Sequence, residues 1–175
     1  MNSRQRIIKR LFDLLVSSIG LVLLSPLLTL VALLILFFDG RPVFFKQERV
    51  GYMGNSFLII KFRTMISNNN KSTVTLYSDK RITRLGKFLR EKKIDELPSL
   101  INVIFGDMSL VGPRPDVKGF ADKLKGRDRR ILLAKPGITS FSSIKYRNEE
   151  RLLDDIDDPV SYNKEVIYPD KVKLN

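Results

Sequence analysis

Two adjacent carboxylates, Asp95 and Glu96, are the residues of this chain best placed to do chemistry. They stand at the start of a helix predicted over residues 95–105, with Pro98 in its first turn, where a missing backbone donor costs nothing. The positive end of the helix dipole favours their ionised forms and places backbone donors where a phosphate can dock. An ionised aspartate can attack phosphorus and form an acyl phosphate. Asp and Glu are also ordinary first-turn residues, and the pair alone favours that interpretation.

Three cations in other segments are suited to holding a diphosphate beside these carboxylates. Lys61 and Arg63 share one side of a predicted strand, with Phe62 on the other side. Arg114 stands between two prolines in a stiff, extended loop, and its guanidinium suits bidentate phosphate binding. Each also has a structural interpretation, namely an exposed strand face for the first two and a solvent-facing turn residue for Arg114.

The composition narrows the chemistry. The chain has 175 residues, no cysteine and no histidine, which excludes thiolate catalysis, disulfides and imidazole bases. The remaining oxygen ligands suit a hard ion such as Mg²⁺. The formal charge of +12 indicates an anionic partner. Because a membrane segment is present, lipid headgroups and phosphorylated substrates outrank nucleic acid, and we expect no nucleic-acid partner.

The elements that position these residues begin with an apolar segment, residues 11–38, whose one charged residue is Asp13. As one straight helix it would be about 42 Å long, more than the ~30 Å hydrocarbon core of a bilayer. Pro26 near its centre predicts a kink, and the Ser25 hydroxyl can bond a carbonyl that the kink frees. We also expect Lys9 to pair with Asp13 one helical turn away.

Charge on both sides of this segment predicts its path through the membrane. The flanking cations are Arg4, Arg6, Lys9 and Arg10 before it, and Arg41, Lys46 and Arg49 after it. Cations favour the cytoplasmic side, so both ends are expected there. The sequence therefore predicts a re-entrant hairpin in one leaflet over residues 1–38 and a cytoplasmic domain over residues 39–175. The alternative is an ordinary proline-kinked span.

The rest of the pattern predicts an α+β domain with a short β-hairpin and amphipathic helices at the membrane interface. The expected elements are strands at 43–50 and 56–65 joined by a loop at 51–55, a loop at 66–78, helices at 80–91, 95–105 and 120–134, and extended chain at 138–146. Asp79 is the predicted cap of the first helix. The helices at 80–91 and 120–134 are basic and amphipathic, which suits an anionic membrane surface. A solvated charged face over a core stripe is the simpler interpretation of the first one.

Four segments together resemble the bacterial sugar transferase family, the monotopic phosphoglycosyl transferases. They are KRLFD at residues 9–13, KFRTM at 61–65, RITRLGKFLREKKIDELPSLINVIFGDMSLVGPRP at 81–115, and KPGIT at 135–139. The resemblance implies an enzyme of the bacterial inner membrane, on its cytoplasmic face, that moves a sugar-1-phosphate from a UDP-sugar to polyprenol phosphate. It also implies a re-entrant, Ser-Pro-kinked hairpin.

The resemblance assigns roles residue by residue. Asp95 and Glu96 match the catalytic dyad, with the aspartate attacking the β-phosphate, UMP leaving and a covalent phosphosugar intermediate remaining. Magnesium is implied as a cofactor, with these two carboxylates as its ligands. Arg90 matches a residue that orients the lipid phosphate. The nucleotide-sugar side is matched by Lys61, Arg63, Arg114, Arg147 and Asn148.

Two other functions stay open at this point. A non-catalytic basic membrane anchor or scaffold needs only the basic helices and the apolar segment, and it predicts that Asp95→Asn leaves function intact. A UDP-sugar diphosphate hydrolase would use the same site with water as acceptor, and it predicts product release without polyprenol phosphate.

Overall fold

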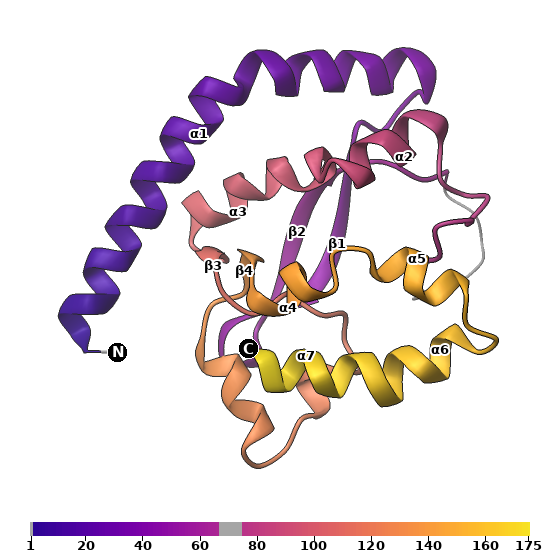
Figure 1. Ribbon diagram of the computed structural model, residues 1–175. Coiled ribbons are helices and arrows are strands. Elements are labelled where there is room, and N and C mark those ends of the chain that lie inside the picture. Colours follow the sequence, from indigo (N-terminus) through magenta and orange to yellow (C-terminus); the bar gives the residue numbers. More distant parts are fainter. Residues whose placement is uncertain (1, 67–74) are drawn as a thin grey trace.

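One long helix, α1 (Ser3–Phe38), frames the fold, running up one side of the molecule and then across its top (Figure 1). The computed structural model describes residues 2–66 and 75–175, so the loop predicted over residues 66–78 lies largely outside the described residues. Below α1 lie two small two-stranded sheets and a series of short helices. This mixture confirms the predicted α+β class.

The bend in α1 has the predicted local chemistry. Pro26 lies inside the helix and has no backbone N–H to donate to the carbonyl four residues earlier, that of Val22. The Ser25 Oγ donates to that carbonyl instead, at 2.7 Å. Because the freed acceptor is satisfied within the helix, α1 changes direction without leaving a bare carbonyl and remains one continuous helix.

The first arm of α1 is fastened to the rest of the molecule by polar contacts. Asp13 is buried and accepts hydrogen bonds from Lys9 Nζ at 2.9 Å, as predicted, and from Ser109 Oγ at 2.8 Å. The Arg10 guanidinium donates to two carbonyls at the end of α3 (Leu100–Phe105), at 2.6 and 2.8 Å. A cation at a helix C-terminus satisfies orphan carbonyls and complements the helix dipole.

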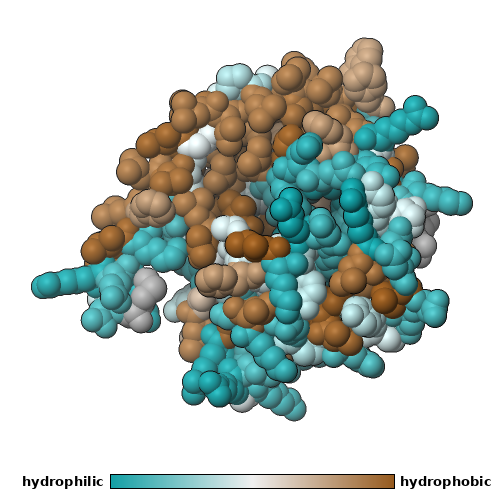
Figure 2. Space-filling view, in the orientation of Figure 1, coloured by the Kyte–Doolittle hydropathy of each residue, from teal (hydrophilic) through white to brown (hydrophobic). Residues whose placement is uncertain are grey.

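The second arm of α1 is held by apolar packing instead. Val31 and Ile35 form one buried cluster with Phe62 and Leu89. Most other apolar side chains of α1 are exposed and gather as a continuous brown surface (Figure 2). By length and composition α1 could cross a membrane. Both of its arms nevertheless contact the same folded body.

The predicted β-hairpin is confirmed. Strands β1 (Phe44–Val50) and β2 (Ser56–Phe62) pair antiparallel, joined by a 3-10 turn at Tyr52–Gly54. Strand β2 ends three residues earlier than predicted. Phe62 is buried against α1, and strand alternation therefore points Lys61 to the opposite face of the hairpin.

The helix predicted over 80–91 begins later than expected. Helix α2 (Arg84–Glu91) starts after Thr83, whose Oγ1 accepts the Gly86 N–H at 2.8 Å. The prediction that Asp79 caps this helix is wrong, because its carboxylate binds the Arg81 guanidinium at 2.6 Å. The helix predicted over 95–105 consists of a 3-10 helix at Ile94–Ser99 followed by α3.

A second small sheet joins distant segments. Strands β3 (Ser109–Val111) and β4 (Gly137–Thr139) pair in parallel. A Cβ on Gly137 would lie 2.1 Å from the Gly112 nitrogen, so only glycine permits this approach. The prediction of a helix over 120–134 is wrong: 3-10 helices cover Ala121–Lys123 and Asp128–Leu133, and Gly126 between them has a left-handed φ of 57°.

The chain after β4 forms short helices. The chain predicted to be extended over 138–146 is extended only to Thr139, because Ser140 caps α4 (Phe141–Lys145) by accepting the Ser143 N–H. The helices that follow are α5 (Glu149–Asp154), α6 (Pro159–Tyr162), a π-helical turn (Asn163–Ile167) and α7 (Tyr168–Leu174). Helices α6 and α7 lie lower than α4 and α5 in the view of Figure 1.

Candidate active site

Asp95 and Glu96 lie in the first turn of the 3-10 helix that follows α2. Lys93 just before it has a left-handed φ of 57°, which turns the chain sharply between the two helices. Both side chains are largely buried, but their surroundings differ. The fold therefore gives two neighbouring carboxylates separate environments.

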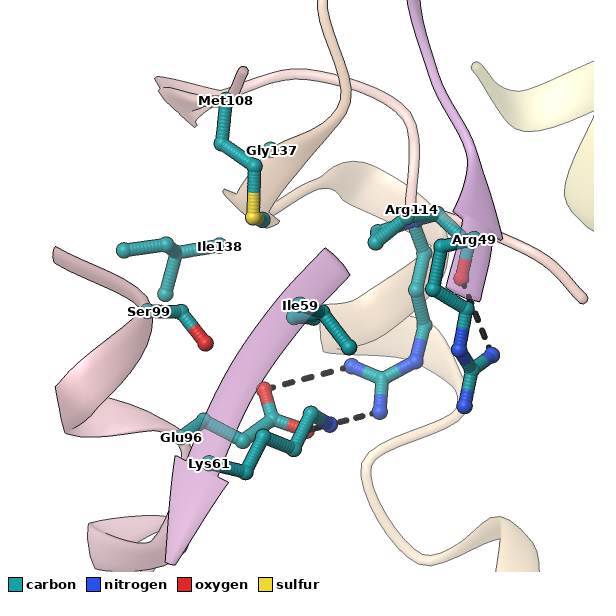
Figure 3. Close-up of a pocket in the computed structure, with 10 residues that line it drawn as sticks. Arg49, Ile59, Lys61, Glu96, Ser99, Met108, Arg114, Gly137 and Ile138 are labelled. Atoms are coloured by element: carbon teal, nitrogen blue, oxygen red, sulfur yellow. Dashed lines mark hydrogen bonds and ion pairs between the residues drawn. The ribbon is translucent and has the colours of Figure 1, made fainter. Parts of the chain in front are cut away.

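Glu96 is held by two cations from other elements. Its Oε1 lies 2.7 Å from Lys61 Nζ of β2 and 2.7 Å from Arg114 Nη2, and Arg114 Nη1 reaches Oε2 at 3.4 Å (Figure 3). Burial alone would raise the pKa of Glu96, but Arg114 and Lys61 outweigh it and hold that pKa well below its ordinary value. Glu96 is therefore a fully ionised anchor for two cations.

The pKa values of these two cations, Lys61 and Arg114, shift in opposite directions. Burial and the neighbouring Arg114 charge lower the pKa of Lys61 to about 8, although Glu96 partly opposes them. Glu96 raises the pKa of Arg114 above its ordinary value, so that guanidinium stays charged. Lys61 is consequently the cation of this cluster that loses its charge within an accessible pH range.

Asp95 has no such compensation. Its side chain is buried, and Oδ1 has no hydrogen-bond partner among the described residues. Burial first and then the Glu96 charge raise the pKa of Asp95, against the attraction of Lys61, Arg90 and Lys93. This direction is opposite to the one predicted from the helix dipole, because removal from water outweighs the small dipole of one 3-10 turn. The result is a buried carboxylate oxygen without a hydrogen-bond partner among the described residues.

Arg90 reaches towards this site from α2 but is bonded elsewhere. Its guanidinium pairs with Glu150 of α5 and donates to Thr64 Oγ1 at 3.3 Å. It is close enough to Asp95 that its charge opposes part of the rise in the pKa of that carboxyl. The predicted lipid-phosphate residue therefore lies near the dyad with a protein carboxylate as its present partner.

Three other predicted residues lie apart from the Glu96 cluster. Arg63 follows the end of β2, and its Nη2 donates to the carbonyls of Asp39 and Gly40, both at 2.6 Å. It therefore does not share a site with Lys61 as strand alternation predicted. Arg147 and Asn148 are exposed in the turn between α4 and α5.

Arg49 also lines this site, although the sequence indicated it only as a cation flanking the apolar segment. It lines the same pocket as Lys61, Glu96 and Arg114 (Figure 3). Its guanidinium donates to Gln47 Oε1 at 2.6 Å and to the Pro115 carbonyl at 3.2 Å. The signal was present in the hairpin, because antiparallel register places residue 49 on the same face as residue 61.

The acidic groups fit a magnesium ion only in part. Within residues 2–66 and 75–175 there is no cluster of three or more His, Cys, Asp or Glu side chains able to hold a metal. Asp95 Oδ1 provides one free ligand, whereas both Glu96 oxygens already bind cations. Mg²⁺ commonly takes one or two carboxylates and completes its shell with substrate phosphates and water. Of the two predicted ligands, Asp95 alone has an oxygen without a partner for that mode of binding, and Glu96 does not fit the predicted role.

A known protein family and a known relative match this chain over almost its whole length. Residues 4–173 match the sequence model of the bacterial sugar transferase family. The chain belongs to the bacterial sugar transferase family. It is 36% identical to a UDP-glucose:undecaprenyl-phosphate glucose-1-phosphate transferase of Klebsiella pneumoniae over 169 residues, covering 93% of this chain and 36% of the relative.

Two further relatives show a similar degree of identity. The exopolysaccharide production protein ExoY of Sinorhizobium fredii is 37% identical, covering 81% of this chain and 70% of that protein. A third relative is a UDP-N-acetylgalactosamine-undecaprenyl-phosphate N-acetylgalactosaminephosphotransferase of Aeromonas hydrophila. It is 40% identical, and the match covers 78% of this chain and 34% of that protein. The chain thus spans about a third of the length of the Klebsiella and Aeromonas relatives.

Proposed function

We propose that this chain transfers a sugar-1-phosphate from a UDP-sugar to polyprenol phosphate, forming polyprenol diphosphosugar and releasing UMP. The relatives named for sugar-phosphate transfer to undecaprenyl phosphate support this reaction class. The observation that carries the proposal is the buried Asp95 Oδ1, which has no hydrogen-bond partner among the described residues.

In the first step an Asp95 oxygen attacks the β-phosphorus of the UDP-sugar. The bond from that phosphorus to the bridging oxygen breaks, and UMP leaves with the oxygen. An aspartyl phosphosugar remains. In the second step an oxygen of polyprenol phosphate attacks the same phosphorus, and the carboxylate of Asp95 leaves. Each step replaces one P–O bond by another, so charge and atoms balance.

The surrounding charges support this chemistry. A carboxylate approaching a diphosphate meets like charge, and fixed cations stabilise the charge that develops on the leaving phosphate. Lys61 and Arg114 are held in place by Glu96 and line the pocket with it. Asp95 is the residue that would hold Mg²⁺ together with substrate oxygens, and the bound ion would offset part of the diphosphate charge.

We assign the acceptor phosphate to Arg90. The Arg90 guanidinium binds the Glu150 carboxylate, and the paired N–H donors of a guanidinium bind a phosphate in the same way. Exchange of Glu150 for the acceptor phosphate would bring that phosphate close to the aspartyl intermediate.

For the membrane we propose a monotopic arrangement on the cytoplasmic face. Lys9 and Arg10 attach the first arm of α1 to the body, and Val31 and Ile35 attach the second arm to the same body. Both ends of the helix therefore stay on one side, and its exposed apolar face enters one leaflet.

The decisive experiment detects the intermediate. The full chain in detergent is incubated with a panel of UDP-sugars without acceptor, quenched in acid and analysed by peptide mass spectrometry. We expect a phosphosugar adduct on Asp95, with UMP released in about equal amount and not beyond. Continued UMP release without acceptor would identify a hydrolase, and UMP formed only with acceptor and no adduct would indicate direct transfer.

Topology is tested independently, since the chain has no native cysteine. Single variants Ser3→Cys and Asn55→Cys, in spheroplasts and in inverted vesicles, should both react with a membrane-impermeant maleimide from the cytoplasmic side. Labelling of the two positions from opposite sides would establish a span and contradict the re-entrant arrangement.

A further inference from the structure

The pocket of Figure 3 contains more positive than negative charge. Three cations, Arg49, Lys61 and Arg114, line it with a single carboxylate, Glu96. Glu96 is shared by Lys61 and Arg114. Within the described residues Arg49 has no ion-pair partner, because its guanidinium donates only to the neutral oxygens of Gln47 and Pro115.

Arg49 is held in position for a ligand. Its Nε is buried and has no hydrogen-bond partner among the described residues. Burial and the neighbouring Arg114 charge lower the pKa of Arg49 to about 10, and Asp116 and Glu96 offset this only in part. A partly buried cation without an ion-pair partner is unfavourable, and an anion that enters the pocket would stabilise it.

The faces of the β-hairpin indicate which anion this is. Phe62 packs against Val31 and Ile35 of α1 on one face, and Lys61 points from the other face into the pocket. The pocket therefore opens on the face of the hairpin turned away from the apolar second arm of α1. A phosphate on a water-soluble nucleotide suits this position better than the headgroup of a lipid held at α1.

We propose that Arg49 binds the α-phosphate of the nucleotide, as a third cation beside Lys61 and Arg114. This assignment rests on the proposed transfer reaction. The α-phosphate carries one negative charge in a UDP-sugar and two in UMP near neutral pH. The surplus cation of the pocket thus matches the charge that the leaving nucleotide gains when its bond to the β-phosphorus breaks.

The test compares nucleotide binding by the full chain in detergent, in the variants Arg49→Gln and Lys46→Gln. Lys46 is an exposed cation of the same strand, three residues away, and therefore lies on the opposite face. We expect Arg49→Gln to weaken UMP binding about tenfold or more and to leave uridine, which has no phosphate, unaffected. Lys46→Gln should bind UMP as the unmodified chain does.

Two results would overturn the assignment. One is unchanged UMP affinity in a folded Arg49→Gln chain. The other is an effect confined to the KM for polyprenol phosphate, which would place Arg49 on the lipid side. If Arg49→Gln does not fold, Arg49→Lys keeps the charge but not the guanidinium fork, and it should still weaken UMP binding several-fold. Unchanged affinity in that variant would contradict the proposal.

The two proposals fail in distinguishable ways. If the unmodified chain releases no UMP from any UDP-sugar, the transfer reaction fails, whereas the binding comparison still tests Arg49. If the unmodified chain turns over but Arg49→Gln has the same UMP inhibition constant, only the assignment of Arg49 fails.

Discussion

Around Glu96, cations from β2 and from the loop after β3 meet on one carboxylate, whereas at Asp95 an oxygen is buried with no partner among the described residues. The cation of α2 that lies near Asp95, Arg90, is bonded to Glu150. Two consecutive acidic residues, Asp95 and Glu96, therefore have different surroundings. The compensated carboxylate, Glu96, fixes the positions of two cations, and the uncompensated one, Asp95, is the nucleophile of the proposed reaction.

The largest effect should follow from removing the uncompensated carboxylate. Asp95→Asn should lower the rate of UMP release about a thousandfold or more, because no nucleophile remains. Its melting temperature should be unchanged or higher, since a neutral amide replaces a carboxylate whose pKa burial raises. Asp128→Asn, at an exposed position, is the control. A normal rate in Asp95→Asn would remove the basis for the mechanism.

Removing the compensated carboxylate should act mainly on stability. Glu96→Gln leaves Lys61 and Arg114 without their shared anion, and we expect a loss of about 2 kcal/mol in the free energy of unfolding. The loss lies below that of a fully buried pair, because the Arg114 side chain is 35% exposed. Chemical unfolding in detergent measures it. Adding Lys61→Met should restore part of the loss, and a purely additive double variant would argue against coupling.

The pH dependence of the reaction should report on Lys61. Its pKa of about 8 means that its positive charge is present below that pH and is lost as the pH rises through it. UMP release should therefore fall above about pH 8. Lys61→Arg keeps its charge at higher pH and should move this fall upward by at least about one unit. An identical alkaline limb in both chains would assign the fall to another group.

The smallest effect is expected at the ion pair between Arg90 and Glu150. Glu150→Gln frees Arg90 from its carboxylate partner and should lower the KM for polyprenol phosphate about threefold, since exchange of a partly exposed ion pair is worth little. The exposed Glu165→Gln is the matched control. An unchanged KM would show that Arg90 does not contact the acceptor.

Local sequence patterns predicted much of what positions the site. Apolar alternation around a glycine-containing loop located the β-hairpin, and Ser25-Pro26 predicted both the bend of α1 and the bond that satisfies it. Hairpin register could also have placed Arg49 on the same face as Lys61. These features depend on neighbours in the chain, which is why they can be read from it.

Features that depend on distant contacts were not predicted. Arg63 leaves the strand face because carbonyls at the end of α1 accept its guanidinium. The pKa of Asp95 moves opposite to the local helix dipole because packing buries it. Burial and competition between partners arise from the assembled fold.

The buried cluster of Val31, Ile35, Phe62 and Leu89 has a practical consequence for anyone preparing this protein. Residues 39–175 made as a separate fragment would leave Phe62 and Leu89 uncovered, and such a fragment should aggregate. The hydrophobic helix α1 is in this sense part of the interior of the protein as well as its proposed membrane segment. A detergent chosen for purification must therefore cover the exposed apolar side chains of α1 without disrupting the packing of Val31 and Ile35 on the rest of the fold.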